Sequence, residues 1–280
     1  MAAWPRARRT AAVETPAIVL EKKLLWEQEK PILDARPLDD SLLVLTPGRL
    51  SLYARQGDGW EPRQSVEVAA SRPWPRDPRG VLVTSGGTLR VYLPGIACTG
   101  TWKPALDVQC RPGEEPWVLE SGTQQMLLAQ YAGNRNYFDG RVVAQSGTRK
   151  SVAPFYSAAA VEDAGAPVWL LAGVDGRTIL YTSGLDAAGE IPQPWGSDLA
   201  GTNARCGNGQ QVLATRAEDA SDAVQAFRLV NRQAEAVSAP VAMPGPVTAL
   251  WSVGSSAVAV VRDANSGKYA AYWLTLACGS

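Results

Sequence analysis

Residues 42–53 read LLVLTPGRLSLY, in which two apolar runs flank the turn residues Thr46, Pro47 and Gly48. Leu, Val and Thr in short runs favour buried strands, and a Pro-Gly pair favours a tight reversal between two such strands. The same order of apolar run, turn and apolar run recurs five more times along the chain. The six first runs are 42–46 (LLVLT), 81–84 (VLVT), 126–129 (MLLA), 168–172 (VWLLA), 212–215 (VLAT) and 257–261 (AVAVV).

Successive first runs begin roughly 40 to 45 residues apart, which is the length of one blade in a β-propeller. A short inner strand is expected before each hairpin, and a more polar outer strand after it. We therefore expect an all-β chain folded as a six-bladed β-propeller, with a seven-bladed ring as the alternative. The inner strands are predicted near 32–36, 73–76, 117–120, 155–159, 203–206 and 247–252.

The two ends of the chain suggest how the ring closes. The last unit reaches Ser280 without a fourth strand, whereas residues 17–27 (AIVLEKKLLWE) form a spare strand before the first unit. Pairing this segment beside residues 269–276 removes an open sheet edge and packs Leu20, Leu24 and Trp26. Residues 17–280 are thus predicted to be a single propeller domain, preceded by a disordered or processed segment, residues 1–16.

Composition restricts the partners of the protein. The chain has 27 basic and 27 acidic residues, so its net charge is zero and binding to nucleic acid through phosphates is disfavoured. No run of 18 or more apolar residues is present, so no membrane span is predicted. We expect a monomer that binds a protein or a glycan.

Histidine is absent from the sequence. This removes His-based acid–base catalysis and Ser-His-Asp or Cys-His nucleophiles. Neither a cofactor nor a metal site is predicted, because Asp263–Gly267 is only a degenerate calcium loop. We therefore expect a non-enzymatic binding or scaffolding module. The alternative is a His-free carbohydrate-active enzyme, of the glycosidase or sialidase kind, that works with a pair of carboxylates.

One set of large polar and aromatic side chains is predicted to meet at the mouth of the central channel. In four of the six units, a residue of this kind precedes the end of the first run by ten positions. Such a set suits a carboxylate, a sugar or a peptide, or else forms a structural plug. The predicted ligand-binding residues are Arg36, Trp74, Glu120, Tyr156, Arg205 and Trp251.

The four cysteines fit two disulfides. Cys206 and Cys278 are expected to emerge on the same face of neighbouring blades, which predicts the pair Cys206–Cys278. Cys98 and Cys110 fall in the second unit, which predicts the pair Cys98–Cys110. Disulfides indicate an oxidising compartment, so the protein is expected to be secreted or periplasmic, although residues 1–16 contain no signal peptide as written.

Four further segments resemble a family of uncharacterised bacterial secreted proteins. This family is grouped with the FG-GAP or VCBS-repeat propellers of the integrin-α N-terminal type. The resemblance implies a propeller and export, and it brings no activity or site. The segments are 72–80 (RPWPRDPRG), 154–159 (PFYSAA), 195–201 (WGSDLAG) and 272–279 (YWLTLACG).

Overall fold

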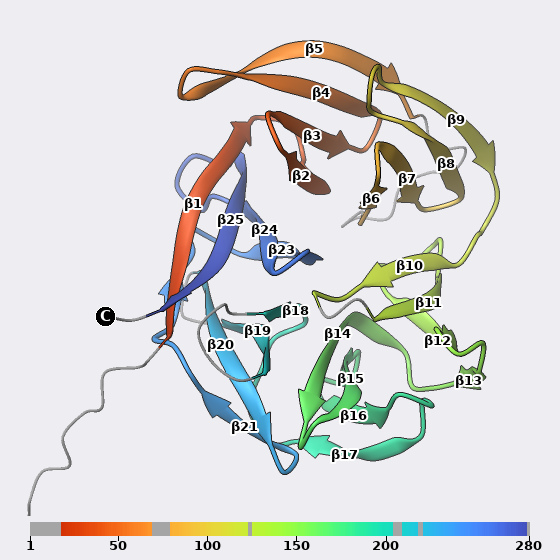
Figure 1. Ribbon diagram of the computed structural model, residues 1–280, viewed down its shortest axis with the longest axis vertical. Helices are drawn as coiled ribbons and strands as arrows, with labels where there is room; N and C mark the ends of the chain where they lie inside the picture. Colours follow the sequence, from red (N-terminus) through yellow and green to blue (C-terminus); the bar gives the residue numbers. More distant parts are fainter. Residues whose placement is uncertain (1–17, 69–78, 123–124, 204–208, 218–220, 279–280) are drawn as a thin grey trace, which may run out of the picture.

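The computed structural model describes residues 18–68, 79–122, 125–203, 209–217 and 221–278. All regular elements within these ranges are β-strands, of which there are 25. The strands form separate sheets arranged around a common centre, as in a β-propeller (Figure 1). The all-β prediction is confirmed.

Two four-stranded sheets come first in the chain, each with its strands in sequence order. The first sheet contains β2 (Asp34–Leu38), β3 (Ser41–Thr46), β4 (Arg49–Gln56) and β5 (Gly59–Glu67). The second sheet contains β6 (Val81–Ser85), β7 (Thr88–Leu93), β8 (Ile96–Thr101) and β9 (Asp107–Pro112).

An eight-stranded sheet follows, and it consists of two units. The units are joined through one residue pair, Phe138 with Phe155. The first unit contains β10 (Trp117–Glu120), β11 (Met126–Tyr131), β12 (Phe138–Ala144) and β13 (Arg149–Ser151). The second unit contains β14 (Phe155–Asp163), β15 (Ala166–Gly173), β16 (Thr178–Thr182) and β17 (Ala187–Ile191).

Of the last two sheets, one is formed by consecutive strands and the other combines strands from both ends of the chain. The five-stranded sheet contains β18 (Leu199–Asn203), β19 (Gln210–Ala217), β20 (Asp222–Val230), β21 (Gln233–Ala236) and β22 (Val241–Ala242). The other sheet has the order β1 (Ile18–Gln28), β25 (Tyr269–Cys278), β24 (Ser256–Arg262) and β23 (Val247–Val253).

The N-terminal strand pairs with the C-terminal one. β1 runs antiparallel to β25, from the pair Ile18–Cys278 to the pair Gln28–Tyr269. Leu20 is buried and Trp26 half-buried, but Leu24 is 49% exposed. The expectation that Leu24 packs into the core is therefore wrong. A β-bulge between Leu24 and Trp26 shifts the alternation of side chains at this point.

Inner strands of different sheets lie next to one another around the centre. β2 lies beside β6 and β23, β6 lies beside β10, and β18 lies beside β14 and β23. Aromatic side chains pack between the strands further out: the rings of Trp117 and Tyr131 stack at 4.2 Å, and Phe138 meets Trp117 edge-on. This packing fixes the inner strands whose side chains point to the centre.

The strand order corrects two details of the sequence prediction. The inner strand of the fifth unit was predicted near 203–206, but it is β18, at Leu199–Asn203. Residues 81–84 were expected to be the second strand of their unit, with the inner strand near 73–76. In the described sheet, β6 is itself the first and innermost strand. Residues 73–76 lie outside the described ranges.

No helix in the described part of the chain is long and apolar enough to cross a membrane.

Candidate functional site

Three of the predicted channel residues meet at the centre of the molecule. Arg36, Glu120 and Trp251 line one cavity together with Val81 and other apolar side chains. The cavity has a volume of about 10 Å³. That volume is close to the minimum that holds a single water molecule. A sugar ring or a peptide side chain does not fit there without rearrangement of these walls.

Arg36 is held by partners from its neighbours. Its Nε donates to Asp34 Oδ2 at 3.0 Å, and its Nη1 donates to the carbonyl of Ser252 at 2.8 Å. Asp34 also accepts a 2.8 Å hydrogen bond from the backbone N–H of Leu82. Since these groups belong to β2, β23 and β6, one buried ion pair ties three sheets together.

Burial dominates the electrostatics of this centre. It raises the pKa of the Asp34 carboxyl to about 6, against the lowering effect of Arg36 and of the backbone N–H groups. Burial also raises the pKa of Glu120, and Arg36 again acts in the opposite direction. The acidic partner of Arg36 in the ion pair is Asp34 rather than Glu120.

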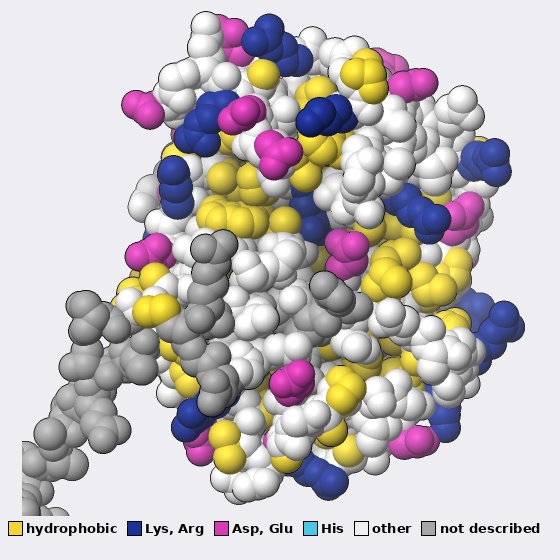
Figure 2. Space-filling model, viewed as in Figure 1, with side chains coloured by type: hydrophobic (Ala, Val, Ile, Leu, Met, Phe, Trp, Pro, Cys, Tyr) yellow, Lys and Arg dark blue, Asp and Glu magenta, His cyan; other side chains and the backbone are white. Residues whose placement is uncertain are grey.

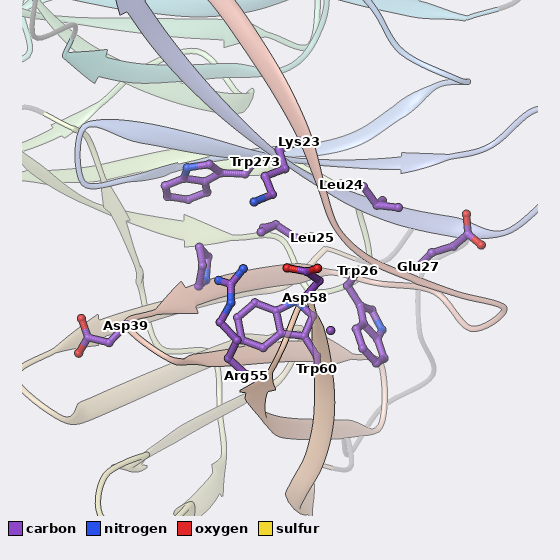
Figure 3. A pocket seen from close by; sticks show the side chains of 12 residues that line it. Lys23, Leu24, Leu25, Trp26, Glu27, Asp39, Arg55, Asp58, Trp60 and Trp273 are labelled. Atoms are coloured by element: carbon purple, nitrogen blue, oxygen red, sulfur yellow. The ribbon is translucent and has the colours of Figure 1, made fainter.

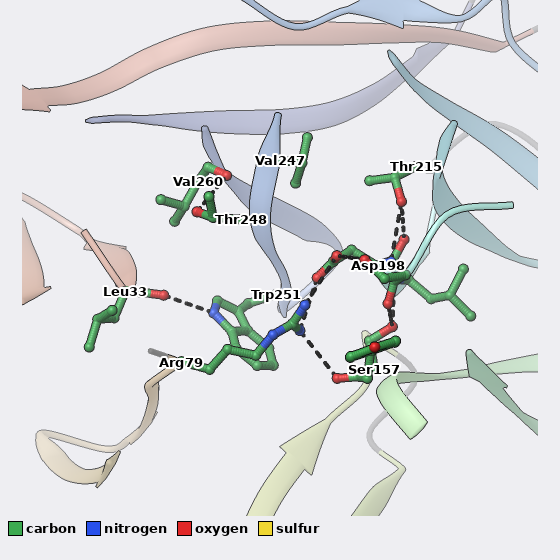
Figure 4. Close-up of polar contacts among 12 residues, drawn as sticks. Leu33, Arg79, Ser157, Asp198, Thr215, Val247, Thr248, Trp251 and Val260 are labelled. Atoms are coloured by element: carbon green, nitrogen blue, oxygen red, sulfur yellow. Dashed lines mark hydrogen bonds and ion pairs between the residues drawn. The ribbon is translucent and has the colours of Figure 1, made fainter. Parts of the chain in front are cut away.

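A second buried ion pair lies at the entry to the inner strands. Arg79, just before β6, contacts Asp198, just before β18, with Nη1 and Oδ1 3.0 Å apart (Figure 4). The pair joins the segments that lead into the inner strands of two different sheets. Arg79 was not predicted as a central residue, because the inner strand of its unit was assigned upstream.

Tyr156 belongs to this end of the centre. Its carbonyl accepts a 3.2 Å hydrogen bond from Arg79 Nη1, and its ring lies 5.9 Å from the Arg79 guanidinium. It does not line the cavity of Arg36, Glu120 and Trp251.

The indole N–H of Trp251 donates to the carbonyl of Leu33 at 3.1 Å (Figure 4).

Two predicted channel residues, Trp74 and Arg205, lie outside the described residues. The offset of ten positions that singled out Trp74 assumed that residues 81–84 form a second strand. Because β6 is the innermost strand of its sheet, Val81 and Val83 line the central cavity from this unit.

The structure bears out one predicted disulfide. Cys98 and Cys110 are directly opposite each other on β8 and β9 and are disulfide-bonded. Cys278 is disulfide-bonded as well. Cys206, its predicted partner, lies outside the described residues, so the pair Cys206–Cys278 stays a prediction.

A much larger concavity lies at the periphery. A groove of about 650 Å³ separates β1 and β25 from the hairpin of β4 and β5. Three tryptophans from three strands line it, as Figure 3 shows: Trp26 of β1, Trp60 of β5 and Trp273 of β25. We refer to this feature as the tryptophan groove.

Local structure explains how each wall is formed. At the bulge, Leu25 is the extra residue between Leu24 and Trp26, and it lines the groove. The ring of Trp26 packs at 4.2 Å against Tyr53 of β4, which joins the two sheets. Its indole N–H donates to Gln28 Oε1 at 3.0 Å. Trp26 is therefore fixed from both sides.

The opposite wall is a hairpin. Arg55 of β4 pairs with Trp60 of β5, and the guanidinium lies 5.4 Å from the indole ring. The turn between them includes Gly57, whose φ of +57° suits glycine, and Asp58. The cation–π contact limits the rotamers of Trp60 and presents the ring to the groove.

Charged side chains of both signs surround the indoles, two basic and three acidic. Lys23 and Arg55 supply positive charge, and Glu27, Asp39 and Asp58 supply negative charge. Figure 2 shows basic and acidic side chains interspersed over the upper part of the molecule, where β4 and β5 run. Within the described residues, no group of three or more His, Cys, Asp and Glu side chains is arranged to hold a metal ion.

Comparisons with known proteins give little beyond this geometry. No family model and no curated protein matches the chain. Among solved structures, the Neurospora crassa Pan2 WD40 domain is similar at 12% identity, covering 87% of this chain and 75% of that one, with a TM-score of 0.49. BBS1N in complex with ARL6DN is similar at 13% identity, covering 83% and 73%, with a TM-score of 0.47.

The N-terminal domain of Nup159 is similar at 11% identity, covering 89% of this chain and 78% of that one, with a TM-score of 0.42. At such identities and scores these likenesses give no information on the partners or activity of this chain. The FG-GAP or VCBS resemblance stays a prediction.

Proposed function

We propose that this protein is a non-enzymatic binding or scaffolding propeller of an exported bacterial protein, and that the tryptophan groove is its binding site. The observation that carries the proposal is the groove itself: about 650 Å³, with three half-buried indoles from three strands. Ligand sites have volumes of this order and combine aromatic walls with a few polar groups.

We further propose that residues 17–280 form one domain of six blades, closed by the N-terminal strand. Division of the eight-stranded sheet at Phe138 and Phe155 leaves six strand groups around the centre. The pairing of β1 with β25 supports closure, because it joins the first strand of the chain to the last sheet. A closed ring also protects the edge of β25 from pairing with other molecules.

Export is supported by the Cys98–Cys110 disulfide. Disulfides persist in oxidising compartments and are rare in reducing ones. The resemblance to secreted FG-GAP or VCBS-type proteins implies the same location.

The central residues have a structural role in this proposal. Arg36 and Asp34 hold three sheets together, and the cavity beside them has a volume of only about 10 Å³. Ligand binding or glycosidase chemistry beside Arg36 and Glu120 needs a larger opening. The pocket lined by Arg79 and Asp198, at about 300 Å³, is less than half the volume of the tryptophan groove. The tryptophan groove offers that space without disturbing the ion pair.

Trp60→Ala tests the proposal, with Trp102→Ala as the matched control. Both indoles are half-buried, and both have a cation over the ring: Arg55 at 5.4 Å and Lys103 at 5.9 Å. Binding of neutral oligosaccharides and of polyproline and charged peptides would be followed by titration calorimetry. Removal of a central aromatic anchor costs about 2 kcal/mol, so we expect the Kd of whichever probe binds to rise about 30-fold for Trp60→Ala.

Trp102→Ala should leave that Kd within about twofold of wild type, because Trp102 does not line the groove. Equal weakening by both variants, or none by Trp60→Ala, would place the binding site elsewhere and overturn the proposal. Cleavage of a bound oligosaccharide would overturn its non-enzymatic part and favour the carbohydrate-active alternative.

A further inference from the structure

We infer that the ligand of the tryptophan groove is a neutral oligosaccharide, an inference that rests on the function proposed above. Trp26, Trp60 and Trp273 supply apolar ring surface along the groove (Figure 3). The face of an indole carries the negative part of its quadrupole. The C–H groups on one face of a sugar ring carry small positive charges, so they pack favourably on that surface.

The polar atoms of the groove suit hydroxyl groups. Asp39 and Asp58 form no ion pair within the described residues, and their carboxylate oxygens are acceptors. Lys23 and Arg55 are donors on the same groove. A sugar hydroxyl both donates and accepts, so a single ligand type can satisfy acids and bases that lie side by side.

The charge balance disfavours a charged ligand. The groove holds two basic and three acidic side chains, which leaves a formal charge of −1. Glu27 is already engaged by Lys268, with Nζ 3.0 Å from Oε1, and this contact offsets one of the three acids. A polyanion or polycation needs a groove of one dominant sign to gain from long-range attraction.

Peptide binding fits the walls less well. β1 and β5 are the outer strands of their sheets, so each offers an edge for strand addition. The bulge at Leu25 interrupts the edge of β1, and Pro62 removes a backbone donor from β5. A polyproline segment could lie on the indoles, but it has no N–H groups for the carboxylates of Asp39 and Asp58.

The experiment titrates wild type, Trp60→Ala and Trp102→Ala with cellohexaose, maltohexaose, hexa-N-acetylchitohexaose and decaproline. Melting curves establish that each variant is folded. We expect at least one hexasaccharide to bind wild type, with a Kd about 30-fold higher for Trp60→Ala and within about twofold for Trp102→Ala. Trp60→Phe keeps an aromatic face and should recover part of the loss.

Decaproline binding that depends on Trp60, without binding of any hexasaccharide, would overturn the oligosaccharide inference and leave the groove as the binding site. Absence of binding by all three hexasaccharides overturns the inference by itself. Hexasaccharide binding that Trp60→Ala leaves unchanged would instead remove the groove from the proposed function.

Discussion

Replacement of Asp34 by asparagine tests whether the central ion pair holds the inner strands together. The carboxylate is fully buried and accepts hydrogen bonds from Arg36 Nε at 3.0 Å and from the backbone N–H groups of Ala35 and Leu82 at 2.8 Å. Asparagine keeps the shape and one oxygen acceptor but removes the charge. The Arg36 guanidinium then stays buried without its acidic partner.

Breaking a buried pair on one side costs about 3–5 kcal/mol. In a chain of this size, each kcal/mol shifts Tm by roughly 2–4 °C, so Asp34→Asn should lower Tm on the order of 10 °C. The melts belong at pH 8, where Asp34 is ionised. Because burial raises the pKa of Asp34 to about 6, its ionisation by itself costs stability above that pH, as it does for Glu120. The loss expected for Asp34→Asn therefore comes from the amide NH2 group, which is set against N–H donors that the carboxylate accepts, and from Arg36 left without an acidic partner. Circular dichroism and urea titration should report the same loss.

Asp186→Asn is the control for charge removal alone. Asp186 pairs with Lys150 at 2.8 Å, but its side chain is 70% exposed. Exposed pairs contribute about 0–1 kcal/mol, so Tm should change by no more than a few degrees. The double variant Asp34→Leu/Arg36→Met should recover part of the loss, because no unpaired charge remains buried. Equal Tm values for Asp34→Asn and Asp186→Asn would refute this account of the centre.

Three other predictions concern stability. Burial raises the pKa of Glu120 in the folded state, so the charge of this residue costs stability above pH 4.5. Glu120→Gln should therefore have a higher Tm than wild type at pH 8, and the difference in Tm should shrink below pH 4.5. A difference that does not change with pH would contradict this prediction. Deletion of residues 1–28 removes all of β1, including the buried Leu20, and exposes the edge of β25, so the shortened chain should aggregate on refolding. If the shortened chain had the Tm of wild type, closure by this strand would be ruled out. Cys98→Ala/Cys110→Ala opens a loop with a sequence separation of 12, which should lower the free energy of unfolding by roughly 3 kcal/mol. An unchanged midpoint in urea unfolding would contradict this prediction.

The period of the sequence predicted the strand groups because each hairpin depends on local sequence, namely an apolar run followed by a turn. Trp117–Glu120 was predicted as an inner strand, and the structure has β10 at those residues. The period does not reveal the rank of a strand within its blade, however. Residues 81–84 have the same apolar character whether they form the first or the second strand of a sheet. The structure places them first, because β6 pairs with β7 and with no second strand of its sheet.

The central site was predicted in part for the same reason. Arg36, Glu120 and Trp251 meet as expected, since their inner strands were assigned correctly. Arg79 was missed because the inner strand of its unit was predicted too far upstream, and Asp34 was not predicted as a central residue. An Asp two residues before an Arg on an inner strand is a recognisable signal for a local ion pair, and the structure shows it at 3.0 Å.

The tryptophan groove gave no signal in the sequence, because its walls come from opposite ends of the chain. Trp26 and Trp273 face it from the paired terminal strands, and Trp60 faces it from the first hairpin. Sheets arranged around a centre converge on the inside and diverge toward the outside. Inner side chains such as Arg36 therefore fill the middle beside Glu120 and hold the sheets together, whereas the wider space of the tryptophan groove opens between outer strands. At the junction of the terminal strands with the first hairpin, the bulge at Leu25 and the Trp26–Tyr53 contact hold these side chains along the walls of the groove, so the groove stays open.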